Sequence, residues 1–293
     1  MRLFNMRNTL MVTLALACIA ANAMAAHVLF LGSDGMSAAI LRRPDIKASV
    51  VRSLMARGAW SLKARTILPS SSASNWAAIF QCSGPEQNGY NDWNTRAPVM
   101  PPSAIDANGR FPDFFARFRA ARPEAKIGYA YGWVGMPFVV DTNVCDFVVQ
   151  TYTPNDEILD WIRANKPDLM TFIFSPPDGA GHNFGWDSPE YAEAVEKVDA
   201  DIGRVLAAYE EAGLLADTFV VFTSDHGGKD KGHGGTSLGE MERPLAFAGP
   251  GVKKGYEIPW VTLTPDVGAT IAHVLGIPPA PEWTGRVIGD IFE

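Results

Sequence analysis

The sequence predicts an α/β protein built on a doubly wound, largely parallel sheet with helices on both faces. Short apolar, β-branched and aromatic runs alternate along the chain with longer segments of helical periodicity, as is typical of parallel strands connected by helices. Several of the apolar runs lead into an aspartate followed by glycine or histidine. Because ligands bind such sheets at the carboxyl ends of the strands, these endings indicate where a functional site would lie.

The start of the chain has the pattern of a secretory signal over residues 1–25. Two arginines precede the apolar run 10–21, and Ala23-Met24-Ala25 offers a small-x-small cleavage site. The alternative is a transmembrane anchor, which is disfavoured because the run is too short to span a bilayer comfortably. Cys18 stands in a poor lipidation sequence. We therefore expect a periplasmic or secreted protein whose mature part, residues 26–293, is one domain without a stable membrane span.

Composition and charge limit the classes of partner. The chain has 293 residues, of which 47% are hydrophobic, enough for a sizeable core. Residues 1–25 contain two arginines and no acidic residue, so their removal changes the formal net charge from −7 to −9. An acidic surface argues against a protein that coats nucleic acid, but it permits a small anionic substrate, since bound cations can reverse the local sign. Cys82 and Cys145 would either form one disulfide or remain free thiols.

The first half of the chain is expected to begin with a buried strand over residues 27–33 that ends in Asp34. A polar turn from residue 68 opens into a helix that reaches Phe80. The segments 84–102 and 134–144 are expected to be loops at the rim of a site. Further helices are expected over 37–42, 47–57 and 111–121, and further strands over 60–66, 126–133 and 146–150.

The second half repeats the alternation of strands and helices. The buried strand 169–174 runs into Ser175-Pro-Pro-Asp178-Gly-Ala-Gly-His182. Ser188 and Pro189 form a typical helix start, and apolar residues keep a helical spacing from there to Gly213. Helices are further expected over 155–165 and 266–275, and strands over 219–222, 244–247 and 261–264.

Residues that suit metal binding follow the apolar runs. A carboxylate beside an imidazole, as in Asp225-His226 at the end of a buried strand, suits a borderline cation such as zinc. Glycines around His233 would let the chain fold this histidine back onto the same site. The full candidate set is Asp34, Ser72, Asp178, His182, Asp225, His226 and His233.

These side chains suit chemistry at phosphorus. The acids and histidines fit two metal sites, and two cations about 4 Å apart would clamp the attacking and leaving oxygens of an in-line displacement. The hydroxyl of Ser72 is a weak nucleophile by itself, and coordination to a cation would activate it. The set contains three of the five histidines of the chain. If they bind metal, no obvious Ser-His-Asp triad remains.

The order and spacing of these residues resemble the alkaline phosphatase superfamily, most closely its type I phosphodiesterase/nucleotide pyrophosphatase branch. The resemblance covers nearly the whole mature chain and rests on Asp34-Gly35, Ser72-x-x-Asn75, Asp178-x-x-x-His182, Asp225-His226-Gly227 and His233-Gly234.

The resemblance implies an alkaline phosphatase-like catalytic domain over residues 26–293 and two divalent metal ions, usually Zn²⁺. It implies that Asp178, His182 and His233 hold one ion, and that Asp34, Asp225 and His226 hold the other. It also implies that Ser72 lies between these ligand sets and forms a covalent phosphoryl or nucleotidyl intermediate.

Substrate contacts are implied by the same resemblance. Asn91, in Asn91-Asp92-Trp93, resembles the asparagine that donates a hydrogen bond to a phosphoryl oxygen, although the loop before it departs from the family's usual His-Gly version. Asn75, at the start of the helix that carries Ser72, is a second expected contact. The family nucleophile is more commonly threonine. Here four serines compete for the role, Ser70, Ser71, Ser72 and Ser74, and Ser72 is favoured because it stands three residues before Asn75.

The predicted function is therefore a two-metal phosphoester hydrolase that acts on phosphodiester or pyrophosphate-type, nucleotide-like substrates. One alternative is a phosphomonoesterase on the same scaffold. An Arg or Lys beside Ser72 would favour this alternative, because a monoester carries more negative charge, and the sequence has none there. Another is a secreted metal- or phosphate-binding protein without turnover. In a purely structural domain, Asp178 would be a turn residue and His182 a surface histidine. The Cys/Ser-x-Pro-x-Arg motif of the related sulfatases is absent.

Overall fold

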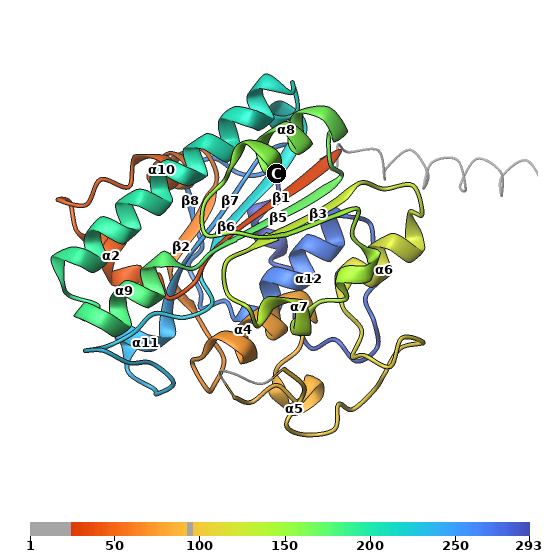
Figure 1. The fold of residues 1–293 in the computed structure, drawn as a ribbon, viewed down its shortest axis with the longest axis horizontal. Helices are drawn as coiled ribbons and strands as arrows, with labels where there is room; N and C mark the ends of the chain where they lie inside the picture. The colour runs from red at the N-terminus through yellow and green to blue at the C-terminus, as the bar shows by residue number, and fades with distance from the viewer. Residues whose placement is uncertain (1–24, 93–95) are drawn as a thin grey trace, which may run out of the picture.

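The computed structural model of the chain describes residues 25–92 and 96–293, so nearly all of the predicted signal segment lies outside the described residues. Within them the strands form one eight-stranded sheet in the order β4-β3-β5-β1-β6-β7-β2-β8 (Figure 1). The strands are β1 (His27–Ser33), β2 (Ala59–Arg65), β3 (Ile127–Tyr131), β4 (Phe147–Gln150), β5 (Leu169–Phe174), β6 (Thr218–Thr223), β7 (Glu242–Ala248) and β8 (Tyr256–Glu257).

The sheet is largely parallel. The five neighbouring strands β4, β3, β5, β1 and β6 all run in the same direction. Strand β7 is antiparallel to β6 and to β2, and β2 pairs in parallel with β8. The predicted fold class is confirmed, with one reversed strand inserted beside the parallel block.

Helices cover both faces of the sheet, as Figure 1 shows. One face carries α4 (Ser72–Phe80), α6 (Phe114–Ala121), α7 (Met136–Val139) and α12 (Thr264–Val274). The opposite face carries α2 (Ala38–Arg42), α3 (Ser49–Ala56), α8 (Asp156–Asn165), α9 (Pro176–Phe184) and α10 (Pro189–Glu211). Two short helices, α5 (Pro85–Asn88) and α11 (Leu238–Met241), lie in loops, and 3₁₀ turns occur at Thr142–Val144, Leu215–Asp217 and Gly289–Ile291.

The strand predicted over 261–264 is wrong. Only Leu263 forms an isolated bridge, to Arg65, and helix α12 already begins at Thr264. Pro265 in the first turn has no N–H to donate to a sheet, and the carboxylate of Asp266 accepts a hydrogen bond from the backbone N–H of Leu263 at 2.8 Å. The two predicted rim loops are also more ordered than expected, because they contain α5, α7 and the 3₁₀ turn 142–144.

Aromatic packing fixes α4, the helix that carries the expected nucleophile. All nine residues of α4 are buried. Trp76 packs edge-on against Phe30 of β1, with ring centroids 6.3 Å apart, and stacks on Phe80 at 6.1 Å. Phe80 in turn contacts Phe115 of α6 at 5.6 Å. A helix clamped by interlocked rings in a close-packed core has little freedom to move, so its first residue has a defined position.

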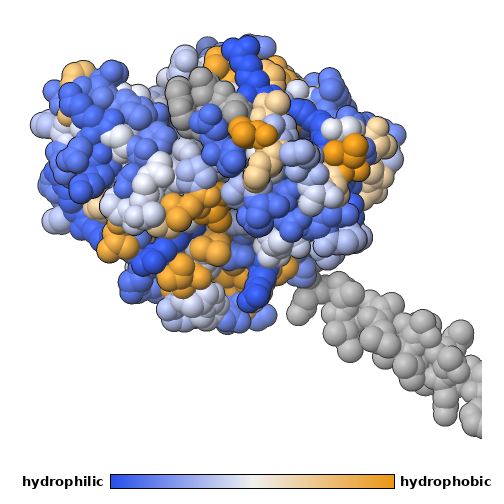
Figure 2. All heavy atoms as spheres, turned by 90° about the horizontal axis from the view of Figure 1, so that it is seen from below, coloured by the Kyte–Doolittle hydropathy of each residue, from blue (hydrophilic) through white to orange (hydrophobic). Residues whose placement is uncertain are grey.

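The described surface is mostly hydrophilic on the face that Figure 2 shows. Seen from below, hydrophilic side chains cover most of the molecule, and hydrophobic side chains form patches between them (Figure 2). No helix among the described residues is long and apolar enough to cross a membrane.

Cys82 is buried and Cys145 is half-buried, and both are free thiols rather than partners in a disulfide.

Candidate active site

The three aspartates of the candidate set follow three neighbouring strands. Strand β1 lies between β5 and β6, and the carboxyl ends of all three point to the same edge of the sheet. The last β1–β6 pair is Gly32 with Thr223, so Asp34 and Asp225 each stand two residues beyond it and meet at the same level. The backbone N–H of Gly35 donates to Oδ1 of Asp225 at 3.1 Å and locks the two strand ends together.

Asp34, Asp225 and His226 form the first cluster. Nε2 of His226 lies 3.3 Å from Oδ2 of Asp225 and 3.6 Å from Oδ1 of Asp34. All three residues are buried. The hydroxyl of Ser224 joins the segments that carry them, since it accepts from the N–H of Met36 at 2.9 Å and donates to the carbonyl of His226 at 2.7 Å.

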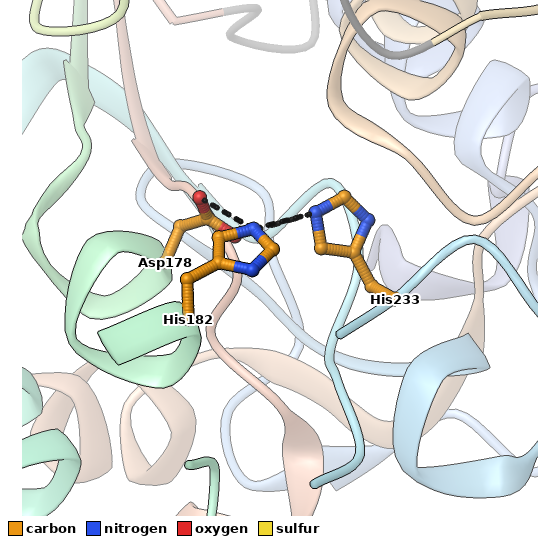
Figure 3. Close-up of side chains that lie close together, drawn as sticks. All are labelled: Asp178, His182 and His233. Carbon is orange, nitrogen blue, oxygen red and sulfur yellow. Dashed lines mark hydrogen bonds and ion pairs between the residues drawn. The ribbon is translucent and has the colours of Figure 1, made fainter. Parts of the chain in front are cut away.

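Asp178, His182 and His233 form the second cluster (Figure 3). Asp178 and His182 are four residues apart on α9, and that spacing places both on one helix face. His233 comes from the loop after β6, and its Nε2 lies 3.1 Å from Nε2 of His182 and 3.6 Å from Oδ1 of Asp178. The ring of His233 stacks on that of His226, with centroids 3.8 Å apart, so the two clusters are adjacent.

Each histidine of the two clusters forms a hydrogen bond between its Nδ1 and a backbone carbonyl. The acceptors are the carbonyl oxygens of Lys231 for His182 at 3.0 Å, Gly227 for His226 at 2.7 Å and Ser70 for His233 at 3.0 Å. A carbonyl only accepts hydrogen bonds, so these contacts assign the proton of each neutral ring to Nδ1. The lone pair on each Nε2 then points into a cluster, which is the arrangement of histidines that bind metal.

The electrostatics of the clusters also fit cations. Burial raises the pKa of Asp225 to about 8, and burial together with Asp225 and Asp178 raises the pKa of Asp34 well above its usual range. Burial lowers the pKa of His226, and it lowers that of His233 to about 4. Oδ1 of Asp178 and Oδ2 of Asp225 are buried and have no hydrogen-bond partner among the described residues. A divalent cation in each cluster would compensate these buried acceptors.

The four competing serines have different environments. Oγ of Ser72 lies 3.1 Å from Nε2 of His226 and 3.4 Å from Oδ1 of Asp34, at the edge of the first cluster. The hydroxyl of Ser70 is used by the loop of His233, and Oγ of Ser74 is buried without a partner among the described atoms. Ser71 lines the neighbouring cavity. Because Oγ of Ser72 contacts the first cluster, Ser72 stays the predicted nucleophile.

His226 is not arranged as the base of a Ser-His-Asp triad. In a triad the carboxylate accepts from one ring nitrogen and the serine faces the other. Here Ser72, Asp34 and Asp225 all face Nε2 of His226, and Nδ1 is held by the carbonyl of Gly227. Two carboxyl groups and a hydroxyl that converge on the lone pair of one imidazole are typical of a metal site.

A cavity of about 340 Å³ opens beside the second cluster. Asn91, the expected phosphoryl-oxygen donor, lines it together with His182 and His233. Asn75 does not. Its side chain is fully buried and bonds to the backbone of residues 67–71 and to the hydroxyl of Thr264. This placement argues against the expected contact of Asn75 with substrate, and instead gives it the role of holding the turn before Ser72.

Sequence reasoning also missed two groups that shape the site. Ser224 and Glu240 lie outside both clusters, yet each holds a loop that carries a cluster histidine. The hydroxyl of Ser224 donates to the carbonyl of His226, and a carboxylate oxygen of Glu240 accepts from the N–H of Gly235. The helix over 176–184 was not predicted either. Its signal was present, since Ser175-Pro176 repeats the N-cap and proline pattern that correctly predicted the start of α10.

Cation binding is expected to release a proton below about pH 8. The carboxyl group of Asp225 has a raised pKa of about 8 in the metal-free protein, and it must be ionised to act as a ligand. The apparent affinity for Zn²⁺ should therefore rise with pH between 6 and 8, and the raised pKa of Asp34 acts in the same direction. His233, with its pKa of about 4, contributes no proton above pH 5. Calorimetric titration in two buffers of different ionisation enthalpy measures the release. A Zn²⁺ affinity that does not change between pH 6 and pH 8 would contradict this prediction.

Comparison with known proteins shows which family the chain resembles in sequence. The family model described as type I phosphodiesterase / nucleotide pyrophosphatase matches residues 28–258. Ectonucleotide pyrophosphatase/phosphodiesterase family member 7 of Homo sapiens is 35% identical over 72 residues, which are 25% of this chain and 16% of that protein. Family member 1 of Mus musculus is 25% identical over 209 residues, which are 66% of this chain and 23% of that protein. The alignments thus span less than a quarter of the length of these relatives.

Solved structures show the same fold. Murine ectonucleotide pyrophosphatase/phosphodiesterase 5, inactive and in complex with AMP, has a TM-score of 0.74 and 14% identity, covering 91% of this chain and 100% of that one. A phosphonate monoester hydrolase from Silicibacter pomeroyi has a TM-score of 0.66 and 16% identity, covering 91% of this chain and 76% of that one. At these identities the likeness supports the architecture alone.

Proposed function

The chain belongs to the type I phosphodiesterase / nucleotide pyrophosphatase family, and from that membership we propose that it is a two-metal hydrolase of phosphodiester or pyrophosphate-type substrates. The observation that carries the proposal is the position of Ser72, whose Oγ contacts one of two adjacent ligand clusters at the end of the parallel strands. The AMP bound to the murine structural neighbour is consistent with nucleotide-like substrates.

The residues that would hold the ions are those of the two clusters. Asp34, Asp225 and His226 would hold the ion next to Ser72. The second ion would be held by Asp178, His182 and His233. Carboxylate oxygens and imidazole nitrogens suit Zn²⁺, which is the ion we propose for both sites. When bound, the ions lower the pKa of a coordinated hydroxyl and neutralise charge on the phosphoryl oxygens.

The protein groups would then act in sequence. The Ser72 hydroxyl loses its proton to solvent and Oγ forms a bond to phosphorus, while the bond from phosphorus to the leaving oxygen breaks and that oxygen takes up a proton. Water then attacks the phosphoryl-serine, the bond from phosphorus to Oγ breaks, and the hydroxyl regains a proton as the phosphate product leaves. Asn91 lines the cavity, where its amide would donate to a phosphoryl oxygen. The first N–H groups of α4, which begins at Ser72, favour the same anionic group. Location in the periplasm or outside the cell remains a prediction from residues 1–25.

Diesters are expected to react faster than monoesters. The described residues that line the cavity include Asp92 and no lysine or arginine, so a second negative charge on phosphorus would meet no cationic side chain among them. We expect kcat/KM for an aryl alkyl phosphodiester to exceed that for the corresponding aryl phosphomonoester by about 10-fold or more, a difference of roughly 1.4 kcal/mol. Parallel assays with p-nitrophenyl esters make the comparison.

Two results would redirect the proposal. A faster monoester reaction would favour the phosphomonoesterase alternative on the same scaffold. The absence of turnover, with no phosphoserine trapped by rapid acid quench, would favour a protein that only binds metal or phosphate. Zinc content, measured on the same preparation by elemental analysis, separates an inactive apoprotein from an inactive holoprotein.

A further inference from the structure

Ser70 precedes the expected nucleophile by two residues and contacts the loop of the second cluster. Its side chain is fully buried. The hydroxyl donates to the carbonyl of Gly235 at 2.7 Å and accepts from the N–H of Gly234 at 3.0 Å. Its own carbonyl accepts from Nδ1 of His233 at 3.0 Å. One residue therefore holds three consecutive residues of a loop more than 160 positions away in the chain.

The loop around His233 has few other constraints. Gly234 has a φ of +108°, and no heavy atom would lie within 4 Å of a Cβ added there, so packing does not fix its conformation. Gly234 and Gly235 are only half-buried. Beyond Ser70, a carboxylate oxygen of Glu240 accepts from the N–H of Gly235 at 2.8 Å. Two consecutive glycines have large conformational freedom, which hydrogen bonds from rigid neighbours must restrict.

The partner on the other side of these contacts is rigid. Ser70 stands in the turn that leads into α4, and Asn75 bonds to the carbonyls of Pro69 and Ser71 on either side of it at 3.0 Å. This turn also determines where Ser72 begins the helix. The turn that positions the nucleophile is thus the same structure that supports the loop of His233.

We propose that Ser70 is a positioning residue that holds His233 in reach of Asp178 and His182, so that the second metal site is assembled on the nucleophile turn. This inference rests on the proposed function, because it assigns these three residues to a cation. Without the hydroxyl, the Gly234-Gly235 pair is freer, and the bond from Nδ1 of His233 to the backbone carbonyl of residue 70 is left to hold Nε2 near its two partners. Outer-shell hydrogen-bond partners of this kind typically change metal affinity by 10- to 100-fold.

Ser70→Ala tests the role, and Ser74→Ala is the matched control. Ser74 is also a buried serine in the same segment, but its hydroxyl has no partner among the described atoms. We expect Ser70→Ala to bind one Zn²⁺ with wild-type affinity and the other about 10- to 100-fold more weakly, as measured by competition with a chromophoric chelator. Ser74→Ala should bind both ions as the wild type does. Ser70→Thr, which keeps a hydroxyl, should bind the second ion more tightly than Ser70→Ala.

The possible results are distinguishable. Two tightly bound ions in Ser70→Ala would overturn the role of Ser70 and leave the proposed function intact. A wild-type protein that binds no Zn²⁺ would instead contradict the proposed function. Circular dichroism and thermal unfolding in the presence of chelator compare the metal-free folds. If Ser70→Ala unfolds while Ser74→Ala does not, Ser70 has a general structural role and the inference is wrong.

Discussion

Replacing Ser72 with alanine is expected to lower turnover of an aryl phosphodiester by at least about 10⁴-fold, the effect of removing a covalent nucleophile. Both Zn²⁺ ions should remain bound, because the ligands of the two clusters are intact. The fold should also persist, since α4 is held by the rings of Trp76 and Phe80 rather than by the hydroxyl. Steady-state assays and elemental analysis on one preparation measure both quantities.

Ser74→Ala serves as the control for this variant as well. It removes a hydroxyl from the same helix, two residues further along, where Oγ has no partner among the described atoms. Its turnover should stay within about threefold of the wild type, because a change of one unpaired hydroxyl removes no interaction with the reacting groups. Undiminished turnover in Ser72→Ala would exclude Ser72 as the nucleophile and return the question to Ser71, the neighbouring serine that lines the cavity.

Replacing His226 with alanine should remove one of the two ions and lower turnover by at least about 10³-fold. Its Nε2 is the point at which the first cluster converges, 3.1 Å from Oγ of Ser72 and 3.3 Å from Oδ2 of Asp225. Its ring also stacks on His233 at 3.8 Å, so some loss of affinity at the second site is expected. Zinc stoichiometry by elemental analysis and steady-state kinetics check the two effects.

His273→Ala is the matched control for the His226 variant. His273 lies on the exposed side of α12, outside both clusters, and its ring contacts Phe292 at 5.8 Å. That variant should keep both ions and wild-type turnover. If His226→Ala retains two tightly bound ions at full activity, the first cluster is not a metal site and the proposed mechanism fails.

The sequence was a good guide to residues placed by regular structure. Asp34 and Asp225 follow β1 and β6, and strand ends can be predicted from apolar runs. The sequence was a poor guide where neighbouring residues favour different local structures. Gly179 and Gly181 weaken the helical pattern of α9, whereas Ser175-Pro176 is a pattern typical of a helix start. The i, i+4 spacing of Asp178 and His182 becomes meaningful only once that helix exists.

Asn75 shows a different limit. Asn75 was expected to contact substrate, whereas its amide is turned into the protein and bonds to the backbone before Ser72. A sequence gives the spacing of two residues along a helix, but when the whole helix is buried it does not show which of them faces the site and which faces the protein backbone. Burial of α4 against β1 and α12 decides that.

By itself the sequence determined the fold class and the ends of the strands before Asp34 and Asp225, and it indicated six candidate metal ligands, because hydrophobic periodicity and residue chemistry are local properties. Tertiary structure decided which atoms converge. The order β5-β1-β6 brings three aspartates to one edge, backbone carbonyls direct three Nε2 lone pairs inward, and Ser70 ties a glycine loop to the nucleophile turn. The carbonyls that His182 and His233 meet lie 49 and 163 positions away in the chain, and no local pattern encodes which distant carbonyl a histidine will meet.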